Sequence, residues 1–351
     1  MPASALDLPE FDPTPLFDIF RGNYATELLV AAVSEFRVFD RLAAGPLSPI
    51  DLRAQLGLAE RPFNVLLTAL RAFGLVGTDI DGNYVLQPVA DEHLVSQAKF
   101  AVGDYFGLAA SSPGVREMVQ RLRSNRPAHA DSEEDGAAFI YRSGIESAME
   151  REASARWLTL ALAGRARNVA PALAQQVDLS GAHRLVDVGG GTGIYAIAFL
   201  QKHPQLRAVV FDRPEVLKVA AEIAHEYGVH DRLELAPGDM FVDPLPAPAD
   251  AILLSNVLHD WDVPECRALI HRCSEALAPS GRLLIHDVFL NDAHDGPLPI
   301  ALYSASLFSL TEGRAYSQKE YRSWLAEVNF TAGPARPTRI HCGVIDAKRS
   351  R

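Results

Sequence analysis

A run of glycines between a predicted strand and a predicted helix is the first place where the sequence indicates chemistry. Val186–Val188 is followed by Gly189-Gly190-Gly191-Thr192-Gly193, and then by Ile194–Ile197. Glycine has no side chain and tolerates positive φ, so a ligand can lie almost against such a backbone. The helix that follows offers free N–H groups and a positive dipole end to a polar or anionic group. The segment therefore predicts a site for a nucleotide-like cofactor.

The spacing of these glycines separates two kinds of cofactor. A dinucleotide fingerprint reads G-x-G-x-x-G. Here Gly189 and Gly191 fit its first two positions, but the third is Ile194. The pattern is instead D-x-G-x-G-x-G, and it starts at Asp187 inside the strand. A carboxylate at that point could receive an ammonium group or an ordered water network.

Acidic residues at the ends of the next two predicted strands complete the cofactor prediction. Asp212 ends the second strand, where a carboxylate would accept hydrogen bonds from ribose hydroxyls. Asp239-Met240 follows the third strand and would put an acid and an apolar side chain beside a purine. An amino-acid end, a ribose and an adenine without a pyrophosphate clamp describe S-adenosylmethionine. Taken singly, Asp212 could cap the next helix and Asp239 could be a turn residue.

One of the 11 histidines has surroundings that suggest a function. His259 lies in Leu258–Asp262, directly after the fourth predicted strand and beside two acids and a tryptophan. Ligands meet at the carboxyl ends of the strands in doubly wound sheets. His259 is therefore a candidate for the reacting part of the site.

The elements that must position these residues are short apolar strands alternating with helices from residue 185 onward. Near-continuous apolar strands joined by helices predict a doubly wound, mainly parallel, Rossmann-like α/β sheet covered on both faces. The predicted strands are Leu185–Val188, Ala208–Phe211, Leu233–Leu235, Ala251–Leu254 and Leu283–Asp287, with a last pair near Phe330 and at Ile340–Ile345.

The N-terminal region has a different pattern. Residues 14–44 are helical by periodicity, Ser48-Pro49 starts a short helix that stops at Gly57, and a second helix spans about Glu60 to Phe73. A hairpin around Asp81-Gly82 follows, which gives a winged-helix order. DNA binding is not expected, because residues 1–100 hold 7 Lys and Arg against 13 Asp and Glu. The second helix carries only Arg61 and Arg71, so its apolar surface is expected to meet another protein chain.

Composition limits the class of protein further. The chain has 351 residues, a formal net charge of −11 and 48% hydrophobic residues, enough for two domains with cores. Its acidity argues against nucleic acid and anionic membranes as partners. The sequence shows no signal peptide and no apolar run of membrane-spanning length. Its three cysteines, Cys266, Cys273 and Cys342, have no disulfide or metal spacing, so we expect a reduced cytoplasmic protein.

Beyond its separate motifs, the chain resembles the caffeate- and acetylserotonin-type O-methyltransferases over nearly its whole length. The resemblance rests on Val186–Gly193, Phe211-Asp212-Arg213-Pro214, Gly238-Asp239-Met240, Leu258-His259-Asp260-Trp261 and Gly281–Asp287. It implies a winged-helix dimerisation domain over 1–100, a helical connector over 101–180 that contributes to the substrate pocket, and a methyltransferase domain over 181–351. It also implies a homodimer in which His259 is the general base that removes a hydroxyl proton.

Two departures from the family pattern bear on this base. The first of two acids that flank the histidine matches Asp287, which is shorter by one methylene than the usual glutamate. The second acid would stand at Ala315, and Tyr316 replaces the basic residue after it. Asp287 or Asp260 would then orient His259 alone, or the base would be weaker. The other departure is Ser255, a predicted cofactor contact where many plant relatives carry a basic residue.

The resemblance leaves the acceptor open. We expect a small aromatic or polyketide-like molecule that is methylated on a hydroxyl group. The alternative is a family member that methylates carbon or nitrogen, or that binds the cofactor without methyl transfer. No metal is expected, since strand alternation turns His286 away if Asp287 points toward the site. The predicted acceptor contacts are Trp157, Leu162, Tyr303, Ser306, Leu307 and Phe308.

Overall fold

A computed structural model describes residues 2–126 and 152–350 of the chain. The chain divides into two compact units. Unit 1 consists of Met1–Phe17, Gly136–Phe289 and Tyr316–Arg351, and unit 2 of Asp18–Asp135 and Leu290–Ala315, each as far as its residues are described. The predicted polar junction Ser124–Asp135 lies largely outside the described residues.

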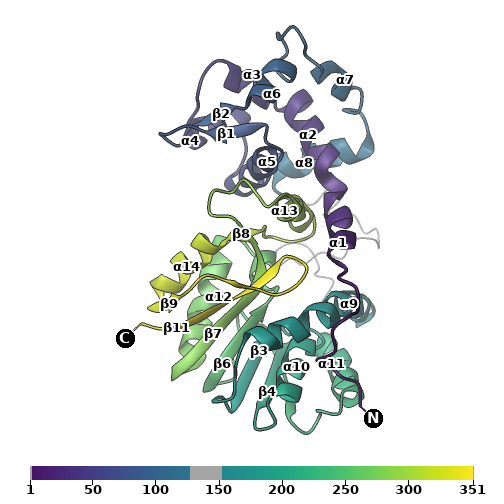
Figure 1. Cartoon of the computed structure of the whole chain (residues 1–351), viewed down its shortest axis with the longest axis vertical. Helices are drawn as coiled ribbons and strands as arrows, with labels where there is room; N and C mark the ends of the chain where they lie inside the picture. Colours follow the sequence, from purple (N-terminus) through teal and green to yellow (C-terminus); the bar gives the residue numbers. More distant parts are fainter. Residues whose placement is uncertain (1, 127–151, 351) are drawn as a thin grey trace. The chain divides into compact units, whose positions relative to one another are not determined.

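Unit 1 is built on a mainly parallel sheet with the strand order β10-β11-β7-β6-β3-β4-β5 (Figure 1). The parallel pairs are β3 with β4, β3 with β6, β4 with β5 and β6 with β7, while β11 runs antiparallel to β7. The strands are β3 (Arg184–Val188), β4 (Arg207–Asp212), β5 (Leu233–Pro237), β6 (Ala249–Ser255), β7 (Leu277–Leu290), β8 (Tyr316–Ser317), β9 (Phe330–Ala332), β10 (Arg336–Pro337) and β11 (Cys342–Arg349).

Helices cover both faces of this sheet, as the apolar strands predicted. One face carries α9, α10 and α11, which pack on one another, and the other carries α12 and α14 (Figure 1). The bounds are α9 (Glu152–Gln176), α10 (Ile194–Lys202), α11 (Pro214–Glu226), α12 (Val263–Ala276) and α14 (Gln318–Glu327), with a short 3-10 helix η3 (Leu258–Asp260).

Strand alternation decides which side chains reach which face. Along β6, Ile252 and Leu254 enter the core beneath α12 and α14. Asp287 on β7 has the same parity as Ile285, a member of that core, while His286 takes the opposite parity. Because β3, β6 and β7 are parallel neighbours, Asp187, Ser255 and Asp287 all come to the carboxyl edge of the sheet. This edge is where the sequence placed the candidate site.

Unit 2 is mainly helical. Ser48 caps its α4, where the Asp51 backbone N–H donates to Ser48 Oγ over 3.1 Å, and Gly57 ends that helix with a φ of 66°. β1 and β2 form the predicted antiparallel hairpin. The elements are α1 (Thr14–Arg21, which begins in unit 1), η1 (Gly22–Tyr24), α2 (Ala25–Val30), η2 (Ala31–Glu35), α3 (Val38–Ala43), α4 (Pro49–Leu56), α5 (Glu60–Ala72), β1 (Val76–Thr78), β2 (Tyr84–Leu86), α6 (Pro88–His93), α7 (Gly103–Gly107), α8 (Pro113–Ser124) and α13 (Leu298–Leu310).

The helical region predicted over residues 14–44 is interrupted. A 3-10 turn, η1, and a π-helical turn, η2, divide it, and Arg37 takes a left-handed φ of 50° before α3 begins. Apolar periodicity does not report such changes of pitch, since each segment still buries one face. No helix among the described residues has the length and hydropathy needed to cross a bilayer.

Arg61 of α5 has a structural part in unit 2. Its side chain is 5% exposed, and its Nη1 donates to the carbonyl of Thr311 over 2.8 Å while its Nε donates to Asn125 Oδ1 over 2.9 Å. The guanidinium also lies over the Phe308 ring. In a DNA-binding winged helix, α5 would be the recognition helix. One of its two arginines is therefore buried and hydrogen-bonded within the protein, where it cannot contact DNA.

Candidate functional site

The glycine loop between β3 and α10 has the backbone that the sequence predicted. Gly189, Gly191 and Gly193 have φ values of 65°, 59° and 73°, in the left-handed region that favours glycine. A Cβ on Gly191 would meet nothing within 4 Å, so the space above this residue is open. A Cβ on Gly189 would lie 2.9 Å from Val257, which places the loop against the segment that leads to His259.

Asp187 lies under this loop without a matched partner. It is completely buried, and neither carboxylate oxygen has a hydrogen-bond partner of normal geometry among the described residues, although the Ala196 backbone N–H is near enough to lower its pKa somewhat. Burial, together with the nearby charge of Asp212, raises the pKa of Asp187 to about 8. A buried acid of this kind gains stability from a cationic ligand or from its own protonation.

The two acids predicted to meet the ribose and the adenine end both hold backbone turns. Asp212 Oδ2 accepts from the Gly191 N–H over 2.8 Å, and its Oδ1 accepts from the Arg213 N–H. Burial raises the pKa of Asp212 despite these two bonds. Asp239 Oδ1 accepts from the Phe241 N–H, and its Oδ2 lies 3.1 Å from the Arg213 guanidinium. The local roles that the sequence left open are thus real, and each carboxylate oxygen still has a second lone pair.

Met240 is next to the glycine loop. Its sulfur would lie 3.9 Å from a Cβ on Gly189, and its carbonyl accepts from Arg272 Nε over 2.8 Å. The arginine thus fixes the backbone that presents the thioether. This is an apolar surface beside an open loop, as the adenine prediction requires.

His259 and Asp287 form a close pair at the same edge. Nδ1 of His259 lies 2.5 Å from Asp287 Oδ1, and the two side chains are 4% and 1% exposed. Burial raises and the charge of His259 lowers the pKa of Asp287, which on balance falls. Because an ionised carboxylate cannot donate, the Nδ1 carries the proton, and Nε2 of a neutral ring is left as the acceptor.

The acids around the ring set its proton affinity. Burial lowers the pKa of His259, but the charges of Asp287 and Asp260 outweigh it, so the pKa rises above its ordinary value. Asp260 Oδ1 lies 3.6 Å from Nε2, and burial raises the pKa of Asp260 to about 6. In its ionised form, this acid on the Nε2 side would stabilise an imidazolium.

Two tyrosines brace this pair, and the sequence analysis did not assign either of them. Tyr321 donates to Asp287 Oδ2 over 3.1 Å, and the Val288 N–H donates to Oδ1 over 2.8 Å. Tyr316 donates to the carbonyl of Trp261 over 2.6 Å. Ala315, the position of the absent acid, is buried. Tyrosine hydroxyls therefore anchor both Asp287 and the turn that follows His259.

Ser255 belongs to a polar network on the other face of β6 and β7. Its Oγ lies 2.7 Å from His286 Nδ1, and His286 Nε2 lies 3.1 Å from Thr338 Oγ1. Burial lowers the pKa of His286 to about 3, so the ring is neutral. Asn256 Nδ2 donates to Ser255 Oγ over 3.1 Å. His286 points away from the side of Asp287, as strand alternation predicted, and a cofactor role for Ser255 stays a prediction.

The predicted acceptor contacts fall into two sets. Trp157 and Leu162 belong to unit 1 and lie on α9, where they are 65% and 49% exposed. The other four lie on α13 of unit 2, and their side chains already have neighbours in that unit. Arg21 lies over the ring of Tyr303, Ser306 Oγ donates to Asn23 Oδ1, Leu307 is buried and Phe308 is part of the unit 2 core. All six contacts stay predictions.

Two further observations concern ligands. No cluster of three or more His, Cys, Asp or Glu among the described residues has the geometry of a metal site.

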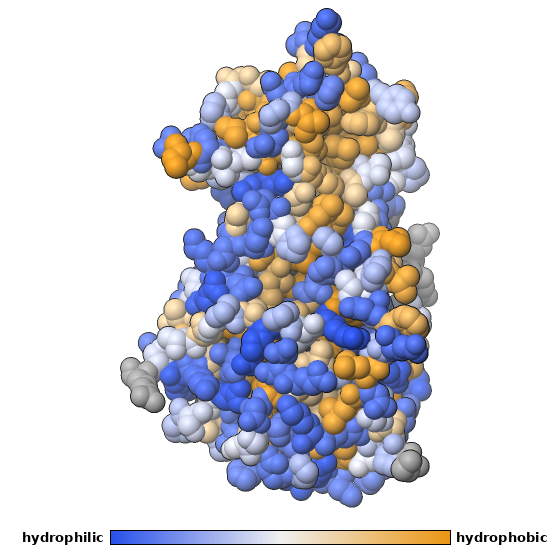
Figure 2. Space-filling model, in the orientation of Figure 1, coloured by the Kyte–Doolittle hydropathy of each residue, from blue (hydrophilic) through white to orange (hydrophobic). Residues whose placement is uncertain are grey.

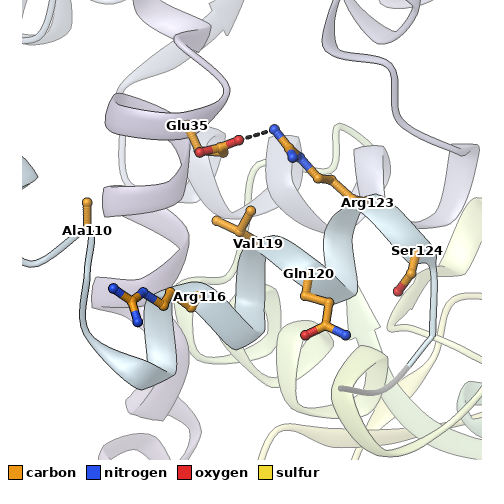
Figure 3. A pocket seen from close by; sticks show the side chains of 7 residues that line it. All are labelled: Glu35, Ala110, Arg116, Val119, Gln120, Arg123 and Ser124. Atoms are coloured by element: carbon orange, nitrogen blue, oxygen red, sulfur yellow. Dashed lines mark hydrogen bonds and ion pairs between the residues drawn. The ribbon is translucent and has the colours of Figure 1, made fainter. Parts of the chain in front are cut away.

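A hollow of about 460 Å³ on unit 2 is lined by Glu35, Ala110, Arg116, Val119, Gln120, Arg123 and Ser124 (Figure 3). Glu35 and Arg123 form an ion pair across it. The hollow contains none of the predicted site residues, so it does not mark the candidate site.

Known proteins resemble this chain over most of its sequence. The family model of the O-methyltransferase domain matches residues 132–331. 3-Hydroxy-5-methyl-1-naphthoate 3-O-methyltransferase of Streptomyces sahachiroi is 35% identical over 317 residues, which cover 90% of this chain and 88% of that protein. Acetylserotonin O-methyltransferase of Mus musculus is 31% identical over 342 residues, covering 92% and 84%.

A solved structure is similar over the full length. It is that of an O-methyltransferase family 2 protein from Planctomyces limnophilus DSM 3776 in complex with apigenin, with a TM-score of 0.89, 49% identity and 99% of each chain covered. Fold, site and matches together define a methyltransferase with a class I α/β sheet. The chain belongs to the O-methyltransferase family of this domain, and the family and the fold class predicted from the sequence are confirmed.

Proposed function

We propose that the chain transfers the methyl group of S-adenosylmethionine to a hydroxyl group of a small aromatic acceptor, with His259 as the general base. The observation that carries this proposal is the pair of His259 and Asp287 beside the glycine loop. Nδ1 of His259 lies 2.5 Å from Oδ1 of Asp287. Nδ1 is occupied by the carboxylate, so Nε2 is the nitrogen that accepts the hydroxyl proton. Asp260, 3.6 Å from Nε2, stabilises the imidazolium that results.

The residues present fit the cofactor. The open space above Gly191 admits a ligand next to the backbone, and Asp187 offers a buried carboxylate without a matched donor. Asp187, Gly189 and Gly191 would hold the amino-acid end, Asp212 the ribose, and Asp239 and Met240 the adenine, with Ser255 at the edge of the site. When bound, the cofactor supplies a sulfonium methyl group as the electrophile.

Positioning and proton transfer share the work. Reference pKa values near 10 for a phenol and 6.5 for histidine put full proton transfer about 5 kcal/mol uphill. The raised pKa of His259 narrows this gap from the side of the base. Alignment of the oxygen with the methyl carbon can supply about 7–11 kcal/mol. Tyr321 holds Asp287, and Tyr316 holds the turn after His259. These two hydrogen bonds serve the alignment, because they fix the position of the imidazole ring.

The nature of the acceptor is proposed from relatives. Their names include a hydroxynaphthoate O-methyltransferase, a tetracenomycin 8-O-methyl transferase at 29% identity, and a complex with apigenin at 49% identity. A hydroxylated aromatic or polyketide-like molecule is the acceptor class they share. Methylation on carbon or nitrogen is less favoured, since the relatives with such names are 28% and 29% identical, below the naphthoate enzyme.

The test of this proposal is methyl transfer from isotopically labelled S-adenosylmethionine to hydroxynaphthoates and apigenin. We expect a mass increase of one methyl group, which NMR places on oxygen. A methyl group found on carbon or nitrogen would replace the proposed reaction by the alternative. Binding of the cofactor without any methyl product from a broad phenol panel would contradict the transfer step itself.

The role of Asp212 has a separate test. Asp212→Ala removes a charged acceptor from the proposed ribose contact, so we expect S-adenosylmethionine to bind about 10- to 100-fold more weakly by calorimetry. The rate at saturating cofactor should change far less, because Asp212 does not contact the reacting atoms. Wild-type affinity in this variant would remove Asp212 from the site.

We also propose a homodimer formed through the N-terminal region, in a cytoplasmic protein. The support is a set of exposed apolar side chains on unit 2: Phe100, Tyr105 and Leu108 are 54%, 73% and 77% exposed. Figure 2 shows apolar side chains gathered over the part of unit 2 that holds α2 and α7. Sedimentation of the wild type should give the mass of two chains, and Leu108→Asp should shift it toward one; a monomeric wild type would contradict the proposal.

A further inference from the structure

Helix α9 brings an arginine to the carboxyl edge of the sheet. Arg165 Nη2 donates to Asn256 Oδ1 over 2.7 Å and to Cys342 Sγ over 3.0 Å, and the side chain is half-buried. Asn256 directly follows β6, three residues before His259. A guanidinium from a helix distant in sequence therefore ends beside the segment that joins β6 to the proposed base and packs against the glycine loop.

The residue that holds Arg165 has an unusual backbone. Asn256 has a φ of 57°, a left-handed conformation that asparagine tolerates better than most residues. Its backbone N–H donates to the carbonyl of His286 over 2.8 Å, and its Nδ2 lies 3.3 Å from the hydroxyl of Tyr195, in the first turn of α10. The amide thus has its oxygen toward Arg165 and its nitrogen toward the helix that begins after the glycine loop.

The charge of Arg165 acts on the whole edge. Its positive charge is one of the causes that act on the pKa values of groups on η3, on β7 and at the start of α10. For each of these groups, acid or histidine, this one cause acts downward. The groups are His259, Asp260, Asp287, His286 and Tyr195. A cation in an otherwise acidic site, which also contains Asp187 and Asp212, is suited to a ligand that carries both charges.

S-adenosylmethionine carries such a pair at its amino-acid end, an ammonium and a carboxylate. The acids of the glycine loop suit the ammonium, but they repel the carboxylate. The loop and Arg165 are tied together, since Val257 packs against Gly189 while its neighbour Asn256 bonds to Arg165. A planar guanidinium offers five donors and matches a carboxylate better than a lysine does.

We propose that Arg165 is a cofactor-binding residue whose guanidinium binds the carboxylate of the amino-acid end of S-adenosylmethionine, held in place by Asn256. The inference rests on the proposed function for the identity of the cofactor. No sequence motif pointed to Arg165.

The test compares two forms of the cofactor by calorimetry on the full chain. Decarboxylated S-adenosylmethionine lacks only the carboxylate. The wild type should bind S-adenosylmethionine about 10- to 100-fold more tightly than the decarboxylated form. Arg165→Gln should lose this preference because its affinity for S-adenosylmethionine falls while its affinity for the decarboxylated form does not. Arg165→Lys should restore part of the preference. Unchanged binding of the decarboxylated form also shows that the variant is folded.

Arg167→Gln is the matched control, because Arg167 lies on the same helix and is exposed. It should keep the wild-type preference. Equal binding of the two forms by the wild type overturns the inference and leaves the proposed function standing, whereas no binding of either form overturns both. If Arg165→Gln weakens a hydroxynaphthoate acceptor and not the cofactor, the carboxylate belongs to the acceptor and the inference is wrong.

Discussion

Unit 1 holds two clusters of buried acids at one edge of its sheet, and their electrostatic states are opposite. Asp287 accepts hydrogen bonds from His259, Val288 and Tyr321, and its pKa is lowered despite complete burial. Asp187 is just as buried, has no hydrogen-bond partner of normal geometry among the described residues, and has its pKa raised to about 8. The two carboxyls differ in their partners and not in their exposure.

This difference separates a part of the site that the chain completes by itself from a part that a ligand completes. The carboxylate of Asp287 accepts from His259, Val288 and Tyr321 within the chain, so the geometry of this cluster is set before any ligand binds. The Asp187 cluster contains a second acid, Asp212, whose charge raises the pKa of Asp187, so a cationic ligand or a proton would stabilise Asp187. We assign the first cluster to proton transfer and the second to a cationic cofactor.

The largest effect is expected from the removal of the imidazole. His259→Ala takes away the group that accepts the proton, and general-base catalysis contributes about 10²- to 10⁴-fold. Single-turnover methyl transfer should slow by this factor, while the affinity for S-adenosylmethionine stays within about twofold by calorimetry. An undiminished rate would mean that His259 is not the general base.

A smaller effect is expected in the stability of the cofactor-free protein. The pKa of Asp187 is higher in the folded than in the unfolded chain, so its contribution is full below about pH 4 and is lost as the pH rises toward 8. The resulting loss is on the order of a few kcal/mol. Asp187→Asn should flatten this part of the pH dependence of the free energy of unfolding, measured by denaturant titration.

The matched variant on the other cluster has the opposite sign. The folded-state pKa of Asp287 is lowered, so its stabilisation is present at neutral pH and is lost as the pH falls through that value. Asp287→Asn should therefore lose stability at pH 7 and lose less at low pH. If both variants changed the slope in the same direction, the two clusters would not differ as described.

The smallest effect is expected from one brace. Tyr321→Phe removes the hydroxyl that donates to Asp287 Oδ2 and leaves the His259 contact in place. The loss of one hydrogen bond to a charged group costs about 1.5–3 kcal/mol of stability, and the rate should fall only about 2- to 10-fold. Thermal unfolding and steady-state kinetics check the two values. A loss as large as that of His259→Ala would make Tyr321 part of the chemistry.

The sheet and its functional edge were predictable from the sequence, because local patterns encode them. Apolar runs fix the strands, and parallel strands bring their carboxyl ends together, so Asp187, Asp212 and His259 could be placed on one edge. The strand ends were less predictable: β7 covers Leu277–Leu290 where Leu283–Asp287 was predicted. Pairing with β6 and β11 extends it, and periodicity alone carries no such information.

The supports of the site could not be predicted from local pattern. Tyr321 and Tyr316 act through tertiary contacts, with partners 34 and 55 residues away in the sequence. The spacing of Tyr321 and Trp324 is that of an ordinary buried helix face, and Tyr316 lies on the short strand before that helix. Arg165 is one of three arginines on α9, with Arg156 and Arg167, so the sequence does not single it out, and its partner Asn256 is 91 residues away.

The central claim is that His259 acts as a base held by Asp287, and its most direct test is the pH dependence of single-turnover methyl transfer between pH 5.5 and 8.5. The wild-type rate should rise through a midpoint above 6.5, because the acids raise the pKa of His259. Asp287→Asn removes the nearest of these charges and should shift the midpoint to lower pH. A midpoint unchanged in Asp287→Asn, or the same profile in His259→Ala, would contradict the account.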